Sequence, residues 1–171
     1  FVRCLQQHAK DHGLGEDTVY WVCAYANNQW RLADELVDDL TQTSFRKALE
    51  AADGTVSVLD AEGKCFTRVW CCYEIFVSLV VKASLKYEVY TALPQGITGW
   101  GDANAVGITD GPGGSARCPE NPNSKTKREK HFPLELLKLA MTTKLEEAEA
   151  SVEADKTRIL NAIAKRPEEE L

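Results

Sequence analysis

FTRVWCCYEIFVSLVV, residues Phe66 to Val81, is the longest apolar run in the chain, and it decides how the rest is arranged. Its β-branched and aromatic residues would also suit a strand, but about sixteen residues is long for a strand and ordinary for a helix. Short β-type runs precede it at Thr55–Leu59 and follow it at Tyr87–Leu93. Strand, helix, strand is the order of an α/β fold, so we predict a buried helix here.

Further runs on both sides extend this alternation. Phe1–Lys10 has apolar residues at helical spacing and is followed by Gly13, which favours a helix end. Val19–Ala26 is a nearly continuous apolar run rich in aromatics, typical of a strand covered on both faces. Residues 43–52 suit a helix capped by threonine or serine, and Ala105–Ile108 suits a fourth strand. We predict a flavodoxin-like, mostly parallel sheet with helices on both faces.

The composition changes after residue 110. Residues 111–133, GPGGSARCPENPNSKTKREKHFP, combine prolines, glycines and a basic cluster. A loop this long in a compact domain is usually functional or disordered. Residues 134–166 again carry apolar side chains at helical spacing. We therefore expect an α/β domain over 1–110, a loop over 111–133, and a C-terminal helical segment over 134–166 that packs on the domain or on a partner.

Composition excludes some classes of protein. The 171 residues are 44% hydrophobic and 27% charged, which suits one soluble globular domain. The net charge of −6 argues against general nucleic-acid binding. No run reaches the roughly eighteen apolar residues of a membrane span. The sequence also shows no signal peptide pattern, so we expect an intracellular protein without a membrane span.

The cysteines and histidines do not follow the spacing of a metal site. No two cysteines form a Cys-x-x-Cys pair, and the three histidines are not spaced to complete a zinc site. Buried free thiols in a reducing compartment are the simpler interpretation. We predict no metal, no cofactor and no disulfide, and a location in the cytoplasm or in an organelle such as a plastid. The residues concerned are Cys4, Cys23, Cys65, Cys71, Cys72, Cys118, His8, His12 and His131.

One carboxylate, Glu74, lies near the middle of the apolar run. On a helix its neighbours are Trp70, Cys71, Val77 and Ser78, and none of them is basic. An unpaired carboxylate in an apolar setting costs several kcal/mol or keeps its proton. Carboxyl groups perturbed in this way gather at functional sites, so Glu74 is the first candidate site residue.

Polar residues follow two of the predicted strands. Asn28 and Gln29 come after Val19–Ala26, and Asp60 comes after Thr55–Leu59. Open α/β sheets bind ligands at the carboxyl ends of their strands, so these three side chains are candidate ligand contacts. The alternative for the two amides is a plain turn, which asparagine favours.

Two short motifs resemble a known family. Trp70-Cys71-Cys72-Tyr73-Glu74 resembles the Trp-Cys-x-x-Glu motif on a helix of TIR domains. The Trp-x-Asp-x-x-Cys-x-Asn-Gln motif of the related HET domains is similar to the stretch that contains Trp21, Asn28 and Gln29. With both motifs in this order and a helical tail, the chain resembles TIR-like proteins of unicellular photosynthetic protists.

The resemblance implies a TIR-like fold and a role for Glu74. In TIR domains that cleave NAD, the glutamate at this position of the motif is the catalytic residue. TIR domains begin with a strand, whereas this chain begins at the helix that follows it. We therefore expect that the first strand is missing or that another segment replaces it. Cys23 and Ala26 stand where the HET motif has aspartate and cysteine, which removes a carboxylate from the predicted strand end.

Two functions from different classes fit these features. The first is a non-catalytic interaction or assembly module, an accessory subunit that contacts a protein partner through the 111–133 loop and the C-terminal helix. The alternative is a NAD glycohydrolase, in which Glu74 stabilises the positive charge that develops on the ribose as nicotinamide leaves. Its pocket would be lined by Asn28, Gln29, Asp60 and Trp70. We rank the interaction module above the enzyme.

Overall fold

The structure is a computed structural model, and it describes residues 1–28, 39–82, 85–92, 105–109 and 134–165. Within these ranges, three strands form one sheet in the order β1-β2-β3. The strands are β1 (Gly54–Leu59), β2 (Lys86–Ala92) and β3 (Ala105–Gly107). β1 and β2 are parallel, and β2 and β3 are antiparallel. The described sheet is therefore mixed, and the prediction of a mostly parallel sheet is too strong.

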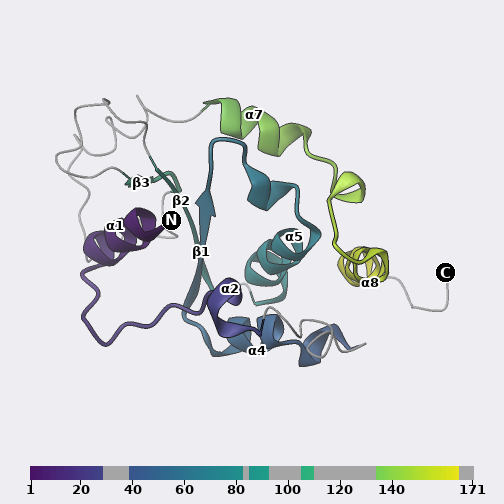
Figure 1. The fold of residues 1–171 in the computed structure, drawn as a ribbon, viewed down its shortest axis with the longest axis horizontal. Coiled ribbons are helices and arrows are strands. Elements are labelled where there is room, and N and C mark those ends of the chain that lie inside the picture. Colours follow the sequence, from purple (N-terminus) through teal and green to yellow (C-terminus); the bar gives the residue numbers. More distant parts are fainter. Residues whose placement is uncertain (29–38, 83–84, 93–104, 110–133, 166–171) are drawn as a thin grey trace.

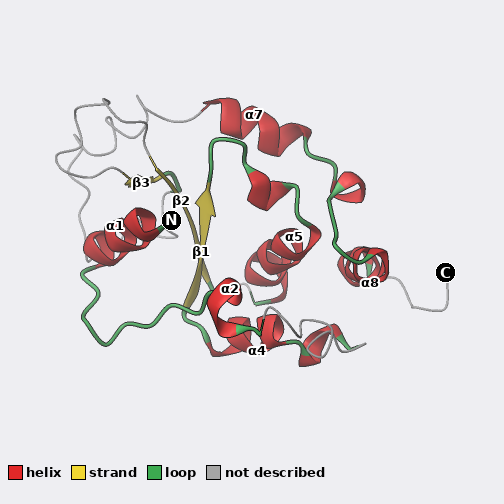
Figure 2. Ribbon diagram, viewed as in Figure 1, coloured by secondary structure: helices red, strands yellow, loops and turns green. Residues whose placement is uncertain are grey.

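Helices surround this sheet (Figures 1 and 2). A π-helical segment, η3 (Val77–Val81), continues directly from α5. The α-helices are α1 (Val2–His12), α2 (Cys23–Ala26), α4 (Ser44–Ala51), α5 (Val69–Phe76), α7 (Leu134–Thr142) and α8 (Glu153–Ala164). The 3₁₀ turns are η1 (Leu40–Gln42), η2 (Lys64–Phe66) and η4 (Leu145–Glu147).

The sheet lies between α1 on one face and α5 on the other (Figure 1). On the α1 side, Cys4 packs with Tyr90 of β2 and Ala105 of β3. On the opposite side, Leu59 and Val89 form a second apolar cluster. An α/β fold with helices on both faces of the sheet is thus confirmed.

The largest apolar cluster holds α5 rather than the sheet. Val69, Tyr73 and Val77 on the central run pack with Leu49 of α4 and with Ile159 of α8. Ile159 is completely buried, so α8 belongs to the core of the domain. The predicted C-terminal helical segment is present, but it is divided into α7, η4 and α8.

Local sequence signals set several helix ends. Gly13 ends α1 in the left-handed conformation, with φ 59° and ψ 35°, where glycine carries no steric penalty. The Thr43 hydroxyl accepts a hydrogen bond from the Arg46 amide and caps α4, as predicted. The helix predicted over Phe66–Val81 is confirmed from Val69 onward, as α5 continued by η3. The prediction that the whole run is buried is wrong at its end, because Leu79, Val80 and Val81 are about half exposed.

The strand predicted at Val19–Ala26 is wrong. The end of this stretch forms the short helix α2, and Val19 is 90% exposed. Trp21 packs edge-on against Phe45 of α4, with ring centroids 5.5 Å apart. An apolar run suits a surface segment laid over a helix as well as a buried strand, and here the aromatic contact with α4 takes the place of sheet pairing.

No helix in the described ranges combines the length and the apolar character that crossing a membrane requires. The 111–133 loop, Gln29 and Cys118 lie outside the described residues.

Candidate functional site

Glu74 lies on α5 and is partly buried. In the described part of the chain, its carboxylate accepts no hydrogen bond and forms no ion pair, and Arg68 is the basic group that acts on it. Burial raises the pKa of Glu74 from its ordinary 4.5 to about 7, while the Arg68 guanidinium pulls the pKa down. Glu74 is therefore partly protonated near neutral pH, as a carboxyl with little solvent and no close cation should be.

Thiols surround this carboxyl group. Burial, and after it the charge of Glu74, raises the pKa of Cys71 to about 12. Burial also raises the pKa of Cys65 to about 12, and that of Cys23 at the start of α2. Because the thiolate is the reactive form, these cysteines are poor nucleophiles at neutral pH. Cys4, Cys65, Cys71 and Cys72 are free thiols.

The other predicted site residues are held by structural contacts. Trp70 stacks on Phe45, with centroids 4.9 Å apart and planes 19° from parallel. Asp60 is exposed, and its Oδ1 accepts the Lys64 amide hydrogen at 2.9 Å, closing the turn after β1. Asn28 is exposed after α2. Trp70 is therefore part of the apolar packing, and Asp60 has a structural role in the turn.

Asp60 and Glu74 have one neighbour in common, the Cys65 thiol. Burial is the largest cause of the raised pKa of Cys65, followed by Cys71 and Cys72, and the charges of Asp60 and Glu74 raise this pKa by less.

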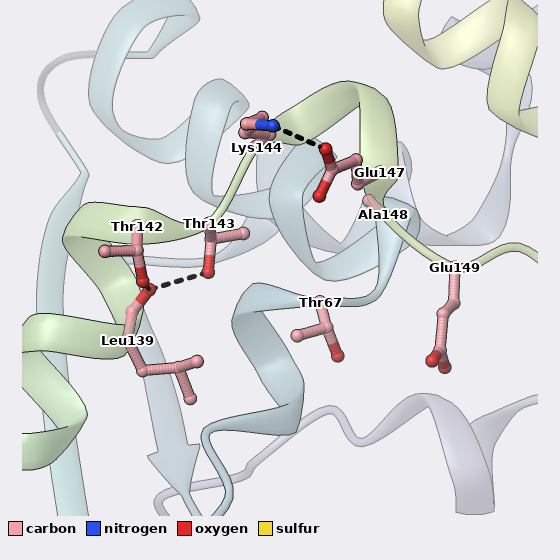
Figure 3. A pocket seen from close by; sticks show the side chains of 8 residues that line it. All are labelled: Thr67, Leu139, Thr142, Thr143, Lys144, Glu147, Ala148 and Glu149. Atoms are coloured by element: carbon pink, nitrogen blue, oxygen red, sulfur yellow. Dashed lines mark hydrogen bonds and ion pairs between the residues drawn. The ribbon is translucent and has the colours of Figure 1, made fainter.

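Two hollows lie beside the start of α5, and neither is lined by Glu74. The larger, of about 260 Å³, lies between the turn after η2 and the α7–η4 connection (Figure 3). The Lys144 ammonium at its rim lies 2.7 Å from the Glu147 carboxylate. Its lining residues are Thr67, Leu139, Thr142, Thr143, Lys144, Glu147, Ala148 and Glu149. The smaller, of about 160 Å³, is lined by Arg68, Trp70, Glu149, Ala150 and Ser151.

A backbone pairing holds the C-terminal segment beside these hollows. The Glu149 amide donates to the Thr67 carbonyl oxygen at 2.6 Å, and the Val69 amide donates to the Glu149 carbonyl oxygen at 2.9 Å. This parallel bridge between Arg68 and Glu149 fixes the chain across the N-terminal end of α5. The two hollows are therefore parts of a seam between secondary-structure elements.

The sequence did not predict one cluster that the structure brings together. His8 and His12 on α1 both face Glu88 of β2. The prediction of no metal rested on comparing the histidines and cysteines with the spacings of zinc sites, and it did not include carboxylates as possible ligands. The four-residue spacing of the histidines on a predicted helix was a usable signal, because such residues share a face. Glu88 gave no signal of its own.

Chemically, the Glu74 site offers a carboxyl group that can hold or release a proton near neutral pH, in a neighbourhood of protonated thiols. The sequence motif around it does not by itself establish a family. Comparisons with protein-family models, with curated proteins and with solved structures find no match for this chain.

Proposed function

We propose that this chain is a protein-interaction or assembly module of TIR-like, flavodoxin-like type, an accessory subunit of a larger complex. The main support for this proposal is the exposure of apolar side chains at the end of the central apolar run. Leu79, Val80 and Val81 in η3 are 52%, 58% and 47% exposed. Single exposed aliphatic residues are common, but three in succession form a patch of the kind that marks a protein contact.

A second exposed apolar group precedes α2. Val19 is 90% exposed and Tyr25 is 79% exposed, while Trp21 between them is partly covered by Phe45. Tyrosine and tryptophan are enriched at protein interfaces because they bring large area at low entropic cost. The partner proposed here is a protein with a complementary apolar surface.

A third exposed apolar group lies on α7, away from α2 (Figure 1), and we propose it as a further contact with the partner. Whereas α8 packs on α5, Leu134 and Met141 of α7 are 62% and 79% exposed. The 111–133 loop, which precedes α7 in the chain, is proposed as part of the same contact. The free thiols fit a reducing compartment, and we propose an intracellular location on that ground.

The experiment introduces one charge into the η3 patch. Val80→Lys should release the chain from its complex, because an ammonium buried in an apolar contact loses its hydration. Ala164→Lys, at the exposed end of α8, is the matched control and should leave assembly unchanged. The measurement is the native size of the tagged chain in an extract of the cells that contain it, followed by identification of the copurifying protein.

Wild type and Ala164→Lys are expected in one larger species with the same partner, and Val80→Lys at the size of the free 19.0 kDa chain. Wild type that is monomeric in the extract would contradict the interaction module. Circular dichroism of Val80→Lys must match wild type, since a misfolded variant would also lose its partner.

The alternative is an NAD glycohydrolase, favoured by the raised pKa of Glu74 and by its place in the Trp-Cys-x-x-Glu motif. We rank it second because neither described hollow is lined by Glu74, and because Trp70 and Asp60 serve packing and a turn. The test is nicotinamide release from NAD by the purified chain. We expect none. Turnover that Glu74→Gln abolishes without changing the fold would reverse the ranking.

A further inference from the structure

Three potential metal ligands converge between α1 and the sheet. The His8 Nε2 lies 3.2 Å from Glu88 Oε2, and the His12 Nε2 lies 2.7 Å from the same oxygen. One ligand atom from each of the three residues lies within 4.8 Å of the others. In the described ranges this is the single group of three such side chains that meets this distance. Its ligands come from α1 and from β2, the middle strand of the described sheet.

A hydroxyl group orients the first histidine. The His8 Nδ1 lies 2.7 Å from the Tyr20 hydroxyl oxygen. With the proton on Nδ1, His8 donates to Tyr20 and leaves Nε2 free as a ligand. Metal-binding histidines are commonly fixed by such a hydrogen bond at their other nitrogen. The Tyr90 ring packs edge-on against His8, with centroids 5.4 Å apart, and its hydroxyl donates to Asp11 at 3.0 Å.

The Glu88 carboxylate is buried against the two histidines. Its side chain is only 7% exposed, and Oε2 forms ion pairs with both imidazoles if these are protonated. Among the described residues no hydrogen bond to Oε2 has good geometry, so protonated histidines or a bound cation must compensate its charge. A buried carboxylate oxygen left in this way is costly unless something else compensates its charge.

We propose that His8, His12 and Glu88 bind one divalent transition-metal ion, with zinc as the fitting probe. Two imidazoles and one carboxylate are one of the sets of three protein ligands that hold zinc with a water molecule as the fourth ligand, whereas Mg²⁺ and Ca²⁺ prefer oxygen ligands. Ligands about 2.1 Å from a tetrahedral ion stand roughly 3.4 Å from one another. The His8 Nε2 is already close to this separation from Glu88 Oε2, at 3.2 Å, whereas the His12 Nε2, at 2.7 Å, needs to move outward by about 0.7 Å.

The site has an opening for a fourth ligand. The His12 side chain is 31% exposed, against 14% for His8. The ion can therefore enter past His12 and keep a water molecule on that side, which is the usual fourth ligand where a protein supplies three.

The experiment uses the full chain, stripped of metal with a chelator and titrated with Zn²⁺ by calorimetry. One ion per chain is expected to bind to wild type, and to raise its Tm by mass action. His12→Gln keeps the size and polarity of the half-exposed residue and is expected to weaken binding at least about tenfold. Glu16→Gln removes an exposed carboxylate elsewhere and is the control for general charge.

A second readout separates this site from the thiols. Co²⁺ bound to His8, His12 and Glu88 should give visible absorption bands without a thiolate-to-cobalt charge-transfer band. Tyr20→Phe should weaken Zn²⁺ binding about tenfold while the stoichiometry stays at one, since it removes only the orienting hydrogen bond. Wild type that binds no Zn²⁺, equal binding by His12→Gln, or a thiolate band in the cobalt spectrum would each overturn the proposal.

Discussion

The Thr55 hydroxyl at the start of β1 lies 2.8 Å from the Ser78 hydroxyl in η3. Ser78 is completely buried, and its hydroxyl donates to the Glu74 carbonyl oxygen at 2.7 Å. Because that proton is used within the helix, Thr55 donates to Ser78. This pair joins the sheet to the end of the central helix at the point where its winding widens from α to π.

We expect Ser78→Ala to lower the free energy of unfolding by about 1–3 kcal/mol. The change removes two hydrogen bonds and leaves the partly buried Thr55 hydroxyl without its acceptor. Urea unfolding followed by circular dichroism measures the loss. Ser151→Ala, at an exposed serine, should stay within about 0.5 kcal/mol of wild type. The double variant Thr55→Val/Ser78→Ala tests whether the two hydroxyls are coupled. If its loss in free energy of unfolding equals the sum of the losses of the two single variants, the pair is not coupled.

A lysine caps the helix that precedes β1. The Lys82 ammonium donates to the carbonyl oxygens of Leu49, Glu50 and Ala52 at 3.2, 2.7 and 3.1 Å, at the C-terminal end of α4. A cation stabilises this end of a helix, where carbonyl groups lack partners. Lys82→Met keeps the stem and removes the charge, so it should cost about 1–2 kcal/mol.

The matched control is Lys86→Met, because Lys86 is exposed and should change stability by less than about 0.5 kcal/mol. Thermal unfolding of both variants at equal pH and salt provides the comparison. Equal Tm values for the two variants would show that the three carbonyl contacts of Lys82 contribute nothing measurable.

Gly107 has no room for a side chain. It pairs with Tyr90 across the antiparallel strands, and an added Cβ would lie 2.9 Å from Cζ of the Tyr90 ring. That ring is only 4% exposed and packs on His8, so it cannot move aside freely. We expect Gly107→Ala to destabilise the chain by about 1–3 kcal/mol in urea unfolding. Gly15→Ala is the control, because a Cβ there meets nothing within 4 Å.

Contiguous runs of sequence were enough to predict β1, β2, β3 and the central helix, because each is specified by its own residues. Val19–Ala26 shows where this fails. Its apolar character is real, but whether it pairs in the sheet or lies over α4 depends on Phe45, which a local pattern does not include. The mixed sheet was not predicted for a similar reason, since the three residues of β3 do not specify the direction in which the strand pairs with β2.

Of the two candidate sites, the one at Glu74 was predicted from local sequence, and the cluster of His8, His12 and Glu88 was not. The sequence places no basic side chain beside Glu74 at helical spacing, and in the structure the cation that acts on it is Arg68, which stands just before α5 begins. The convergence of His8 and His12 on Glu88 was out of reach, because it depends on which position of β2 lies beneath α1. His12 and Glu88 are 76 positions apart in the chain, and no local spacing links them.

The last prediction concerns pH and Glu74. Burial raises the pKa of this carboxyl in the folded chain from 4.5 to about 7, so between these values the folded state holds a proton that the unfolded state has released. Stability from this group is therefore fully present below pH 4.5 and is lost as the pH rises through about 7. The loss is at most about 3 kcal/mol, because each pKa unit corresponds to 1.36 kcal/mol.

Glu74→Gln stays neutral at every pH and should abolish this dependence. The variant should equal wild type near pH 5 within about 1 kcal/mol and exceed it in stability at pH 8. Urea unfolding at both values measures the difference, and Glu16→Gln, on an exposed side chain without an ion pair among the described residues, is the control for the loss of one charge. If Glu74→Gln is no more stable than wild type at pH 8, the folded chain stabilises the ionised Glu74 carboxylate as well as water does in the unfolded chain, and the prediction is wrong.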